Sequence, residues 1–206
     1  MPKKESPLTA LSSFLPEGSF EEVAHYLKYY KVHLTITRER QSILGNYRNK
    51  VLDKNHRISV NGNLNKYSFL ITLLHELAHL LAYEKYGNKI LAHGKEWKEE
   101  YGKILSDFIL EKKFPAEIQK LLTLNLKNPA ATTCADPVLT RALKKFDLKK
   151  DGYFLIEELP AGSFFKVNSG SIFKKGERIR KRFKCVEIET KKTYLFSPVY
   201  EVALVL

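Results

Sequence analysis

Cysteine is scarce in this sequence of 206 residues, which contains only Cys134 and Cys185. Neither belongs to a C-x-x-C pair, so the chain lacks the disulfide framework that staples small secreted domains. Neither has an identifiable base beside it, which argues against cysteine catalysis. This cysteine usage fits a protein of the reducing cytoplasm.

Long apolar runs are also missing. The longest, from Phe69 to Leu74, is far too short to cross a bilayer, so we expect no membrane partner. Near the N-terminus Pro7 and Pro16 interrupt the apolar residues, and we expect no signal peptide. The expected location is therefore cytoplasmic, with nucleoid association if the protein is bacterial.

Acidic residues are the minority charge, with 23 Asp and Glu against 35 Lys and Arg, and the net charge is +12. Residues 137–206 hold 15 basic and 8 acidic residues, so this shorter part contributes seven of the positive charges. Such a surplus indicates an acidic partner, of which nucleic acid is the commonest. The competing interpretation is a merely soluble basic protein.

The densest basic stretch is Arg178-Ile-Arg-Lys-Arg-Phe-Lys184. As a strand, it would place alternate cations on one face. Such a row can follow the phosphates of DNA, single-stranded or duplex, while nearby aromatic rings stack on bases. The nucleic-acid-binding candidates are Arg178, Arg180, Lys181, Arg182 and Lys184. The alternative is a charged edge strand that blocks unwanted pairing.

Apolar spacing predicts an α+β fold in which helices and a small sheet precede a strand-rich tail. The expected helices cover residues 19–30, 65–87, 97–108, 115–124 and 137–146. The expected strands of the sheet cover residues 32–37, 42–48 and 57–61. The expected tail strands cover residues 153–156, 163–167, 171–174, 178–189, 194–197 and 199–206, with turns at 168–170, 175–176 and 191–192.

A stretch from Lys127 to Pro137 has the composition of a linker and marks the expected domain boundary. The expected parts are a flexible arm at 1–17, an α+β domain at 18–126, a linker and helix at 127–152, and a basic all-β module at 153–206.

Two further features are expected to carry no chemistry. Asp147 to Glu158 nearly spells a calcium-binding EF-hand loop, but Lys149 puts a cation where a ligand oxygen belongs, so calcium is not expected. No motif surrounds His25, His33 or His56, and these are expected to be ordinary histidines.

One pattern, His75-Glu76-Leu-Ala-His79, indicates metal chemistry. On a helix, residues four apart share a face, so two imidazoles can hold one Zn²⁺ while Glu76 reaches a water bound to it. The flanking residues are apolar, which predicts a buried helix, and buried polar groups need partners. The competing interpretation is two satisfied core histidines and a surface glutamate.

A catalytic zinc usually has three protein ligands and one water, so a third ligand must come from elsewhere in the chain. The metzincin pattern is absent, and the only methionine is Met1. A following helix offers Glu96, Glu99 and Glu100, and His93 lies just ahead of that helix. The residues themselves leave this choice open.

The His-Glu-x-x-His pattern followed by His93-Gly-x-x-Trp97 resembles the SprT-like domain of bacterial SprT proteins and of the eukaryotic protease Spartan. The resemblance covers roughly residues 18–125, and it includes Leu44 to Tyr47 and Ile58 to Asn61. It implies a minimal zincin-like fold. It also implies one catalytic Zn²⁺, bound by protein side chains and accompanied by a general base.

By this resemblance, His75, His79 and His93 bind the zinc and Glu76 is the general base. The implied activity is that of a zinc metallopeptidase, an endopeptidase that cleaves proteins bound or crosslinked to DNA. Many bacterial relatives add a four-cysteine zinc ribbon, which this chain lacks, so no second zinc is expected. Two alternatives remain, a nucleic-acid-binding protein with a vestigial zinc site and a zinc hydrolase of a non-protein substrate.

Overall fold

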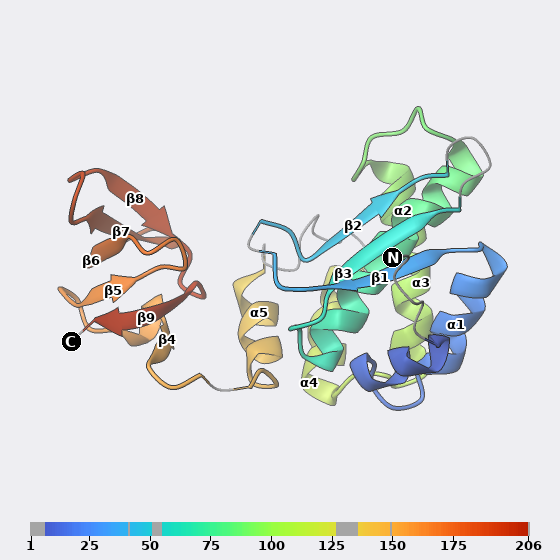
Figure 1. Ribbon diagram of the computed structural model, residues 1–206, viewed down its shortest axis with the longest axis horizontal. Coiled ribbons are helices and arrows are strands. Elements are labelled where there is room, and N and C mark those ends of the chain that lie inside the picture. Colours follow the sequence, from blue (N-terminus) through green and yellow to red (C-terminus); the bar gives the residue numbers. More distant parts are fainter. Residues whose placement is uncertain (1–6, 41, 51–54, 127–135, 149, 206) are drawn as a thin grey trace, which may run out of the picture. The chain divides into compact units, whose positions relative to one another are not determined.

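The chain forms two compact units, which are described separately. The computed structural model describes residues 7–40, 42–50, 55–126, 136–148 and 150–205 (Figure 1). The two units are Met1–Asp147 and Leu148–Leu206. The first combines helices with a three-stranded sheet, and the second has a six-stranded antiparallel sheet, which confirms the α+β class. None of the helices in the described ranges is long and apolar enough to cross a membrane.

The sheet of the first unit has three short strands in the order β1-β3-β2. They are β1 (His33–Thr37), β2 (Gly45–Arg48) and β3 (Arg57–Asn61), close to the expected ranges. The central strand β3 is parallel to β1 and antiparallel to β2, so β2 lies at an edge. Ile58 and Val60 of β3 alternate with less buried residues and enter the core.

Helix α2 is the centre of the first unit and packs against α3, β2 and β3 (Figure 1). Its start is capped by the Asn65 side chain, which accepts hydrogen bonds from the backbone N–H groups of Tyr67 and Ser68. It ends at Gly87, whose φ of 76° suits a residue without a Cβ. The helices of this unit are η1 (Leu8–Phe14), α1 (Phe20–Tyr29), α2 (Lys66–Tyr86), α3 (Lys95–Leu110), α4 (Ala116–Asn125) and α5 (Pro137–Lys144).

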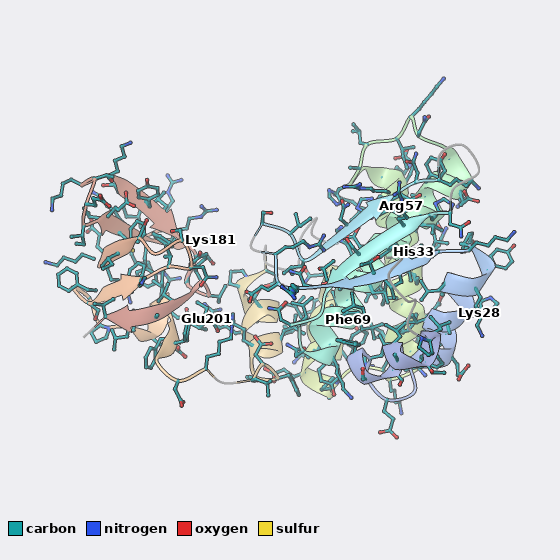
Figure 2. The ribbon with its side chains drawn as sticks, viewed as in Figure 1. Lys28, His33, Arg57, Phe69, Lys181 and Glu201 are labelled. Carbon is teal, nitrogen blue, oxygen red and sulfur yellow. The ribbon has the colours of Figure 1, made fainter. Side chains whose placement is uncertain are left out.

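The expected flexible arm is wrong for the residues that precede α1. Residues 8–14 form the 3-10 helix η1, and Leu11 and Leu15 are buried in the core. Phe14 packs against Phe69, with 5.4 Å between ring centroids. Phe69 is fully buried and is labelled in Figure 2. The apolar side chains of this segment pack on the core, and their burial explains why residues 8–14 are ordered. Residues 1–6 lie outside the described ranges.

The segment between the two expected domains is partly described. Residues 127–135, the expected linker, lie outside the described ranges. The helix that follows, α5, packs on α4 within the first unit. Its last turn is tied to the start of α2, because the Asn65 amide donates to the Leu143 carbonyl oxygen at 3.0 Å.

The second unit is one sheet in the order β4-β9-β5-β6-β7-β8, with a core of its own. Its elements are β4 (Tyr153–Leu155), η3 (Ile156–Glu158), β5 (Phe164–Lys166), β6 (Ile172–Ile179), β7 (Arg182–Glu187), β8 (Thr193–Phe196) and β9 (Glu201–Val205). The buried residues of its core are Ile156, Leu159, Phe165, Phe173, Cys185 and Val202. The core of this unit is therefore formed by apolar side chains.

The expected turn at Lys175-Gly176 is wrong, and so is the single strand expected over 178–189. Strand β6 continues through this point to Ile179, with an irregularity in its pairing between Lys175 and Arg178. Lys175 stays in the strand because its backbone pairs with Cys185 and its buried ammonium donates to the Leu159 carbonyl oxygen. The chain reverses instead at Arg180 and Lys181, and Lys181 is labelled in Figure 2.

We expect Leu73→Ala in α2 to lower the free energy of unfolding by about 2–5 kcal/mol, because it leaves a cavity at a fully buried position. The matched control is Leu124→Ala on α4, where the side chain is 72% exposed, and its effect should stay within about 0.5 kcal/mol. Urea denaturation of both variants measures this difference. Equal losses would contradict the central place of α2.

Candidate metal centre

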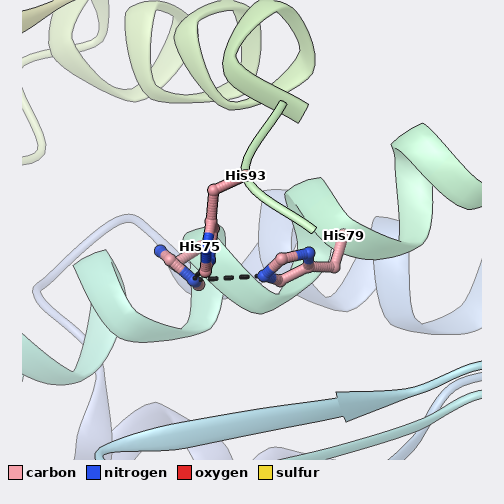
Figure 3. A group of neighbouring side chains, drawn as sticks. All are labelled: His75, His79 and His93. Atoms are coloured by element: carbon pink, nitrogen blue, oxygen red, sulfur yellow. Dashed lines mark hydrogen bonds between the residues drawn. The ribbon is translucent and has the colours of Figure 1, made fainter. Parts of the chain in front are cut away.

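Three imidazoles converge in the first unit (Figure 3). His75 and His79 lie one turn apart on α2, and His93 lies in the segment between α2 and α3. The Nε2 atom of His75 is 3.2 Å from Nε2 of His79 and 3.1 Å from Nε2 of His93. Within the described ranges, this is the one cluster of His, Cys, Asp or Glu side chains that could hold a metal ion.

The convergence of these nitrogens suits metal binding better than hydrogen bonding. Nε2 of a neutral His75 carries either one lone pair or one proton, so it cannot bond well to both neighbouring nitrogens. Nitrogens about 2.0–2.1 Å from a tetrahedral zinc lie about 3.4 Å from one another, close to the two observed separations. The three side chains therefore fit a tetrahedral metal ion with one position left open.

Burial keeps the three imidazoles neutral. Burial, followed by the positive charges of protonated His79 and His93, lowers the pKa of His75 to about 3. Burial, followed by the charge of His93, lowers the pKa of His79 to about 4, and burial also lowers the pKa of His93. At neutral pH each ring therefore offers a lone pair without first losing a proton.

Trp97 of α3 forms one wall of the site. Its indole is fully buried, and its ring centroid lies 4.7 Å from those of His75 and His93 and 5.4 Å from that of His79. Its Nε1 also lies 3.4 Å from the carbonyl oxygen of His75, to which it donates. Packing of α3 on α2 through this residue brings His93 to the other two histidines.

The structure brings His93, and none of the three glutamates, into the cluster. Glu100 instead forms an ion pair with Lys85, with 2.8 Å between Oε1 and Nζ, and Glu99 pairs with Lys85 and Lys103. His93 is placed by the turn before α3, in which the Gly94 N–H donates to the Leu91 carbonyl oxygen at 3.0 Å.

Glu76 lies beside the cluster and is only 6% exposed. Burial raises the pKa of its carboxyl to about 7, against the lowering effects of nearby Arg40 and of the Tyr47 N–H, which donates to the carboxylate. A carboxyl group with this pKa can accept and release a proton near neutral pH. The surface glutamate of the competing interpretation is thus not what the structure contains.

The close approach of β2 to Glu76 depends on Gly45. A Cβ atom at this position would lie 2.5 Å from Oε1 of Glu76 and 2.7 Å from Cγ2 of Thr72. The absence of a side chain therefore allows the edge strand to lie directly against α2. This contact places the backbone of β2 beside the carboxylate.

Sequence analysis missed Arg40, Tyr47 and His56 as parts of this region. The Arg40 Nε donates to Oδ1 of the buried Asn61 at 2.8 Å, which fixes the segment before β2. His56 is 2% exposed, and its Nδ1 lies 2.9 Å from the Tyr47 hydroxyl. Only Tyr47 had a signal, its place in the stretch that resembles the SprT-like domain. The other two have partners that no local pattern indicates.

The basic candidates belong to the second unit. Arg180 and Lys181 form the turn between β6 and β7, and both flanking arginines, Arg178 and Arg182, are exposed. Lys184 follows in β7 and is half-buried. The expected row of cations along one strand face is therefore replaced by a cluster at the end of a hairpin.

We expect His93→Ala to weaken Zn²⁺ binding by more than about 100-fold. Loss of a group that only hydrogen-bonds to a metal-binding side chain already lowers metal affinity by about 10–100-fold, and His93 is expected to bind the metal itself. The matched control is Glu96→Ala, which removes the glutamate nearest to His93 in sequence but outside the cluster. Competition with a chromogenic chelator measures both affinities. A larger loss in the Glu96 variant would move the third ligand to that residue.

Comparison with known proteins matches this part of the chain to one family. Residues 19–119 match the family model described as SprT-like family, and the match spans the sheet, α2, α3 and the start of α4. Searches of curated proteins and of solved structures returned no match. The family match is compatible with a metallopeptidase-like domain. Residues 19–119 of this chain therefore form a segment that is similar to the SprT-like family.

Proposed function

We propose that this protein is a zinc-dependent endopeptidase. The main support is the convergence of His75, His79 and His93 beside the buried Glu76. Neutral imidazoles are ligands that suit zinc, and three of them leave a fourth position for water or substrate. The match to the SprT-like family supports the same reaction class.

The residues of the site divide the chemistry between them. Zinc held by the three histidines would lower the pKa of a bound water toward about 7 and polarise the substrate carbonyl. Glu76 accepts the proton of the attacking water and passes it to the amine that leaves the cleaved peptide bond. The Tyr47 N–H keeps this carboxylate in place while it changes charge.

The outer edge of β2 can hold the backbone of the substrate. The Asn61 N–H donates to the Leu44 carbonyl oxygen at 2.9 Å, so alternate residues of β2 starting from Leu44 bond to β3. The backbone groups of Gly45 and Tyr47 therefore point to the other edge, where the Tyr47 N–H is already bonded to Glu76. An extended peptide added at this edge would pair with the remaining backbone groups and would pass beside the catalytic carboxylate.

DNA is the second partner in this proposal, and the substrates are proteins bound or crosslinked to it. The cations at the β6–β7 turn are exposed and carry part of the net charge of +12. Elsewhere in the same sheet, Lys174 of β6 pairs with Phe164 of β5, and its Nζ lies 5.8 Å from the centroid of the Phe164 ring. Phe164 is 43% exposed. Cations beside exposed rings suit phosphates and unpaired bases.

Two other functions have specific tests. A nucleic-acid-binding protein with a vestigial site would bind DNA but cleave no protein, even when loaded with zinc. A zinc hydrolase of another substrate would need Glu76 but leave casein and histones intact. The presence of an intact, buried Glu76 next to His75 favours an active site over a vestigial one.

We expect Glu76→Gln to keep Zn²⁺ binding but to lower the rate of casein or histone cleavage by about 10²–10⁴-fold, because the amide cannot accept the proton of water. The matched control, Glu99→Gln, makes the same chemical change in a surface ion pair and should cleave like the wild type. Cleavage at wild-type rate by Glu76→Gln would rule out the proposed base.

Reversal of two charges at the hairpin turn, Arg180→Glu with Arg182→Glu, should weaken DNA binding and lower its salt slope by about two. The control reverses Lys191 and Lys192, two exposed cations at another turn of the same unit. Fluorescence anisotropy with single-stranded and duplex DNA at several salt concentrations measures both effects. Equal weakening by the two pairs would mean that net charge, and not this turn, determines binding.

A further inference from the structure

A chain of polar contacts connects edge strand β2 to the far end of α2. The hydroxyl oxygen of Tyr47 lies 2.9 Å from Nδ1 of His56, just ahead of β3. The other ring nitrogen of His56, Nε2, lies 3.3 Å from Oε1 of Glu84 on α2. Glu84 also pairs with Lys50 at 2.8 Å. The contacts therefore return to the helix that carries His75 and His79.

Tyr47 contacts two members of the metal centre directly. Its ring lies parallel to that of His79, with 6.3 Å between centroids and 4° between planes. Its backbone N–H donates to the carboxylate of Glu76. Tyr47 thus lies against both His79 and the proposed base, Glu76. The contact of its hydroxyl with His56 holds its side chain in place.

This contact is buried and has one consistent arrangement of protons. His56 is 2% exposed, and the ring of Tyr83 packs edge-on against it at 5.8 Å. If a neutral His56 donates a hydrogen bond from Nε2 to Glu84, its Nδ1 accepts a hydrogen bond from the Tyr47 hydroxyl. Both ring nitrogens are then satisfied, and the Tyr47 ring is held in one orientation.

We propose that Tyr47 is a positioning residue of the metal centre and that the Tyr47–His56–Glu84 contacts hold it there. The inference deepens the proposed function, because it assigns a role at the same centre. These contacts, called the brace below, fix the distance between β2 and α2. They thereby fix the orientation of the His79 ring and of the Glu76 carboxylate. A merely structural contact would stabilise the fold without affecting the metal.

The test compares Tyr47→Phe, His56→Phe and the double variant. Each single change leaves a buried polar group without its partner and should lower the melting temperature of the metal-free protein. The double change replaces both partners by apolar rings and should restore part of that stability. The matched control is Tyr83→Phe, which removes a hydroxyl from the other ring that contacts His56.

Zn²⁺ affinity, measured by chelator competition, separates positioning from stability. We expect Tyr47→Phe to bind Zn²⁺ about tenfold more weakly, as do proteins that lose an outer partner of a ligand. The double variant should stay about tenfold weaker although its stability recovers, and Tyr83→Phe should stay within about twofold of the wild type.

Three results would overturn the proposal: unchanged Zn²⁺ affinity in Tyr47→Phe, recovery of affinity together with stability in the double variant, or an equal loss in Tyr83→Phe. Because the readout is metal affinity, it is independent of the peptidase reaction. A wild-type protein that binds zinc but cleaves no protein would refute the proposed function and leave the test of the brace intact.

Discussion

The burial of polar groups on α2 is the constraint on which the first unit depends. This helix lies among the other elements, with α3 on one side and β2 and β3 on another, yet it carries two histidines and a glutamate. Burial opposes any charge on these groups, so the histidines stay neutral and the pKa of Glu76 rises to about 7. Burial of these polar groups lowers the stability of the fold relative to a helix with apolar residues at the same positions.

The small sheet contacts α2 beside Glu76 and helps to hold its carboxylate. Strand β2 reaches α2 because Gly45 has no side chain. Two residues further along β2, the backbone N–H of Tyr47 donates to the Glu76 carboxylate. Asn61 at the end of β3 holds Arg40 and so orders the approach to β2. Sheet and helix therefore act as one support for the carboxylate, in which each contact depends on the position of the others.

The second unit is stabilised in a different way. Its sheet encloses apolar side chains, and the buried Cys185 is one member of that core. The charge that distinguishes this unit is concentrated in exposed loops and strand faces. The β6–β7 hairpin brings cations from both strands to one turn, because pairing continues past the glycine that had indicated an earlier turn. The apolar core and the basic surface of this unit are thus separate features.

The sequence by itself determined the central motif and the elements of the first unit from residue 19 onward, because helical spacing places His75 and His79 on one face and strand alternation marks β1 and β3. It also indicated His93 as a third ligand, through resemblance and not through spacing. Tertiary structure brought His93, and none of the glutamates, to His75 and His79, buried the segment at Leu11 and Leu15, and placed the hairpin turn at Arg180. It alone joined Tyr47 to His56 and Glu84, because these side chains come from different parts of the fold and no sequence motif connects them.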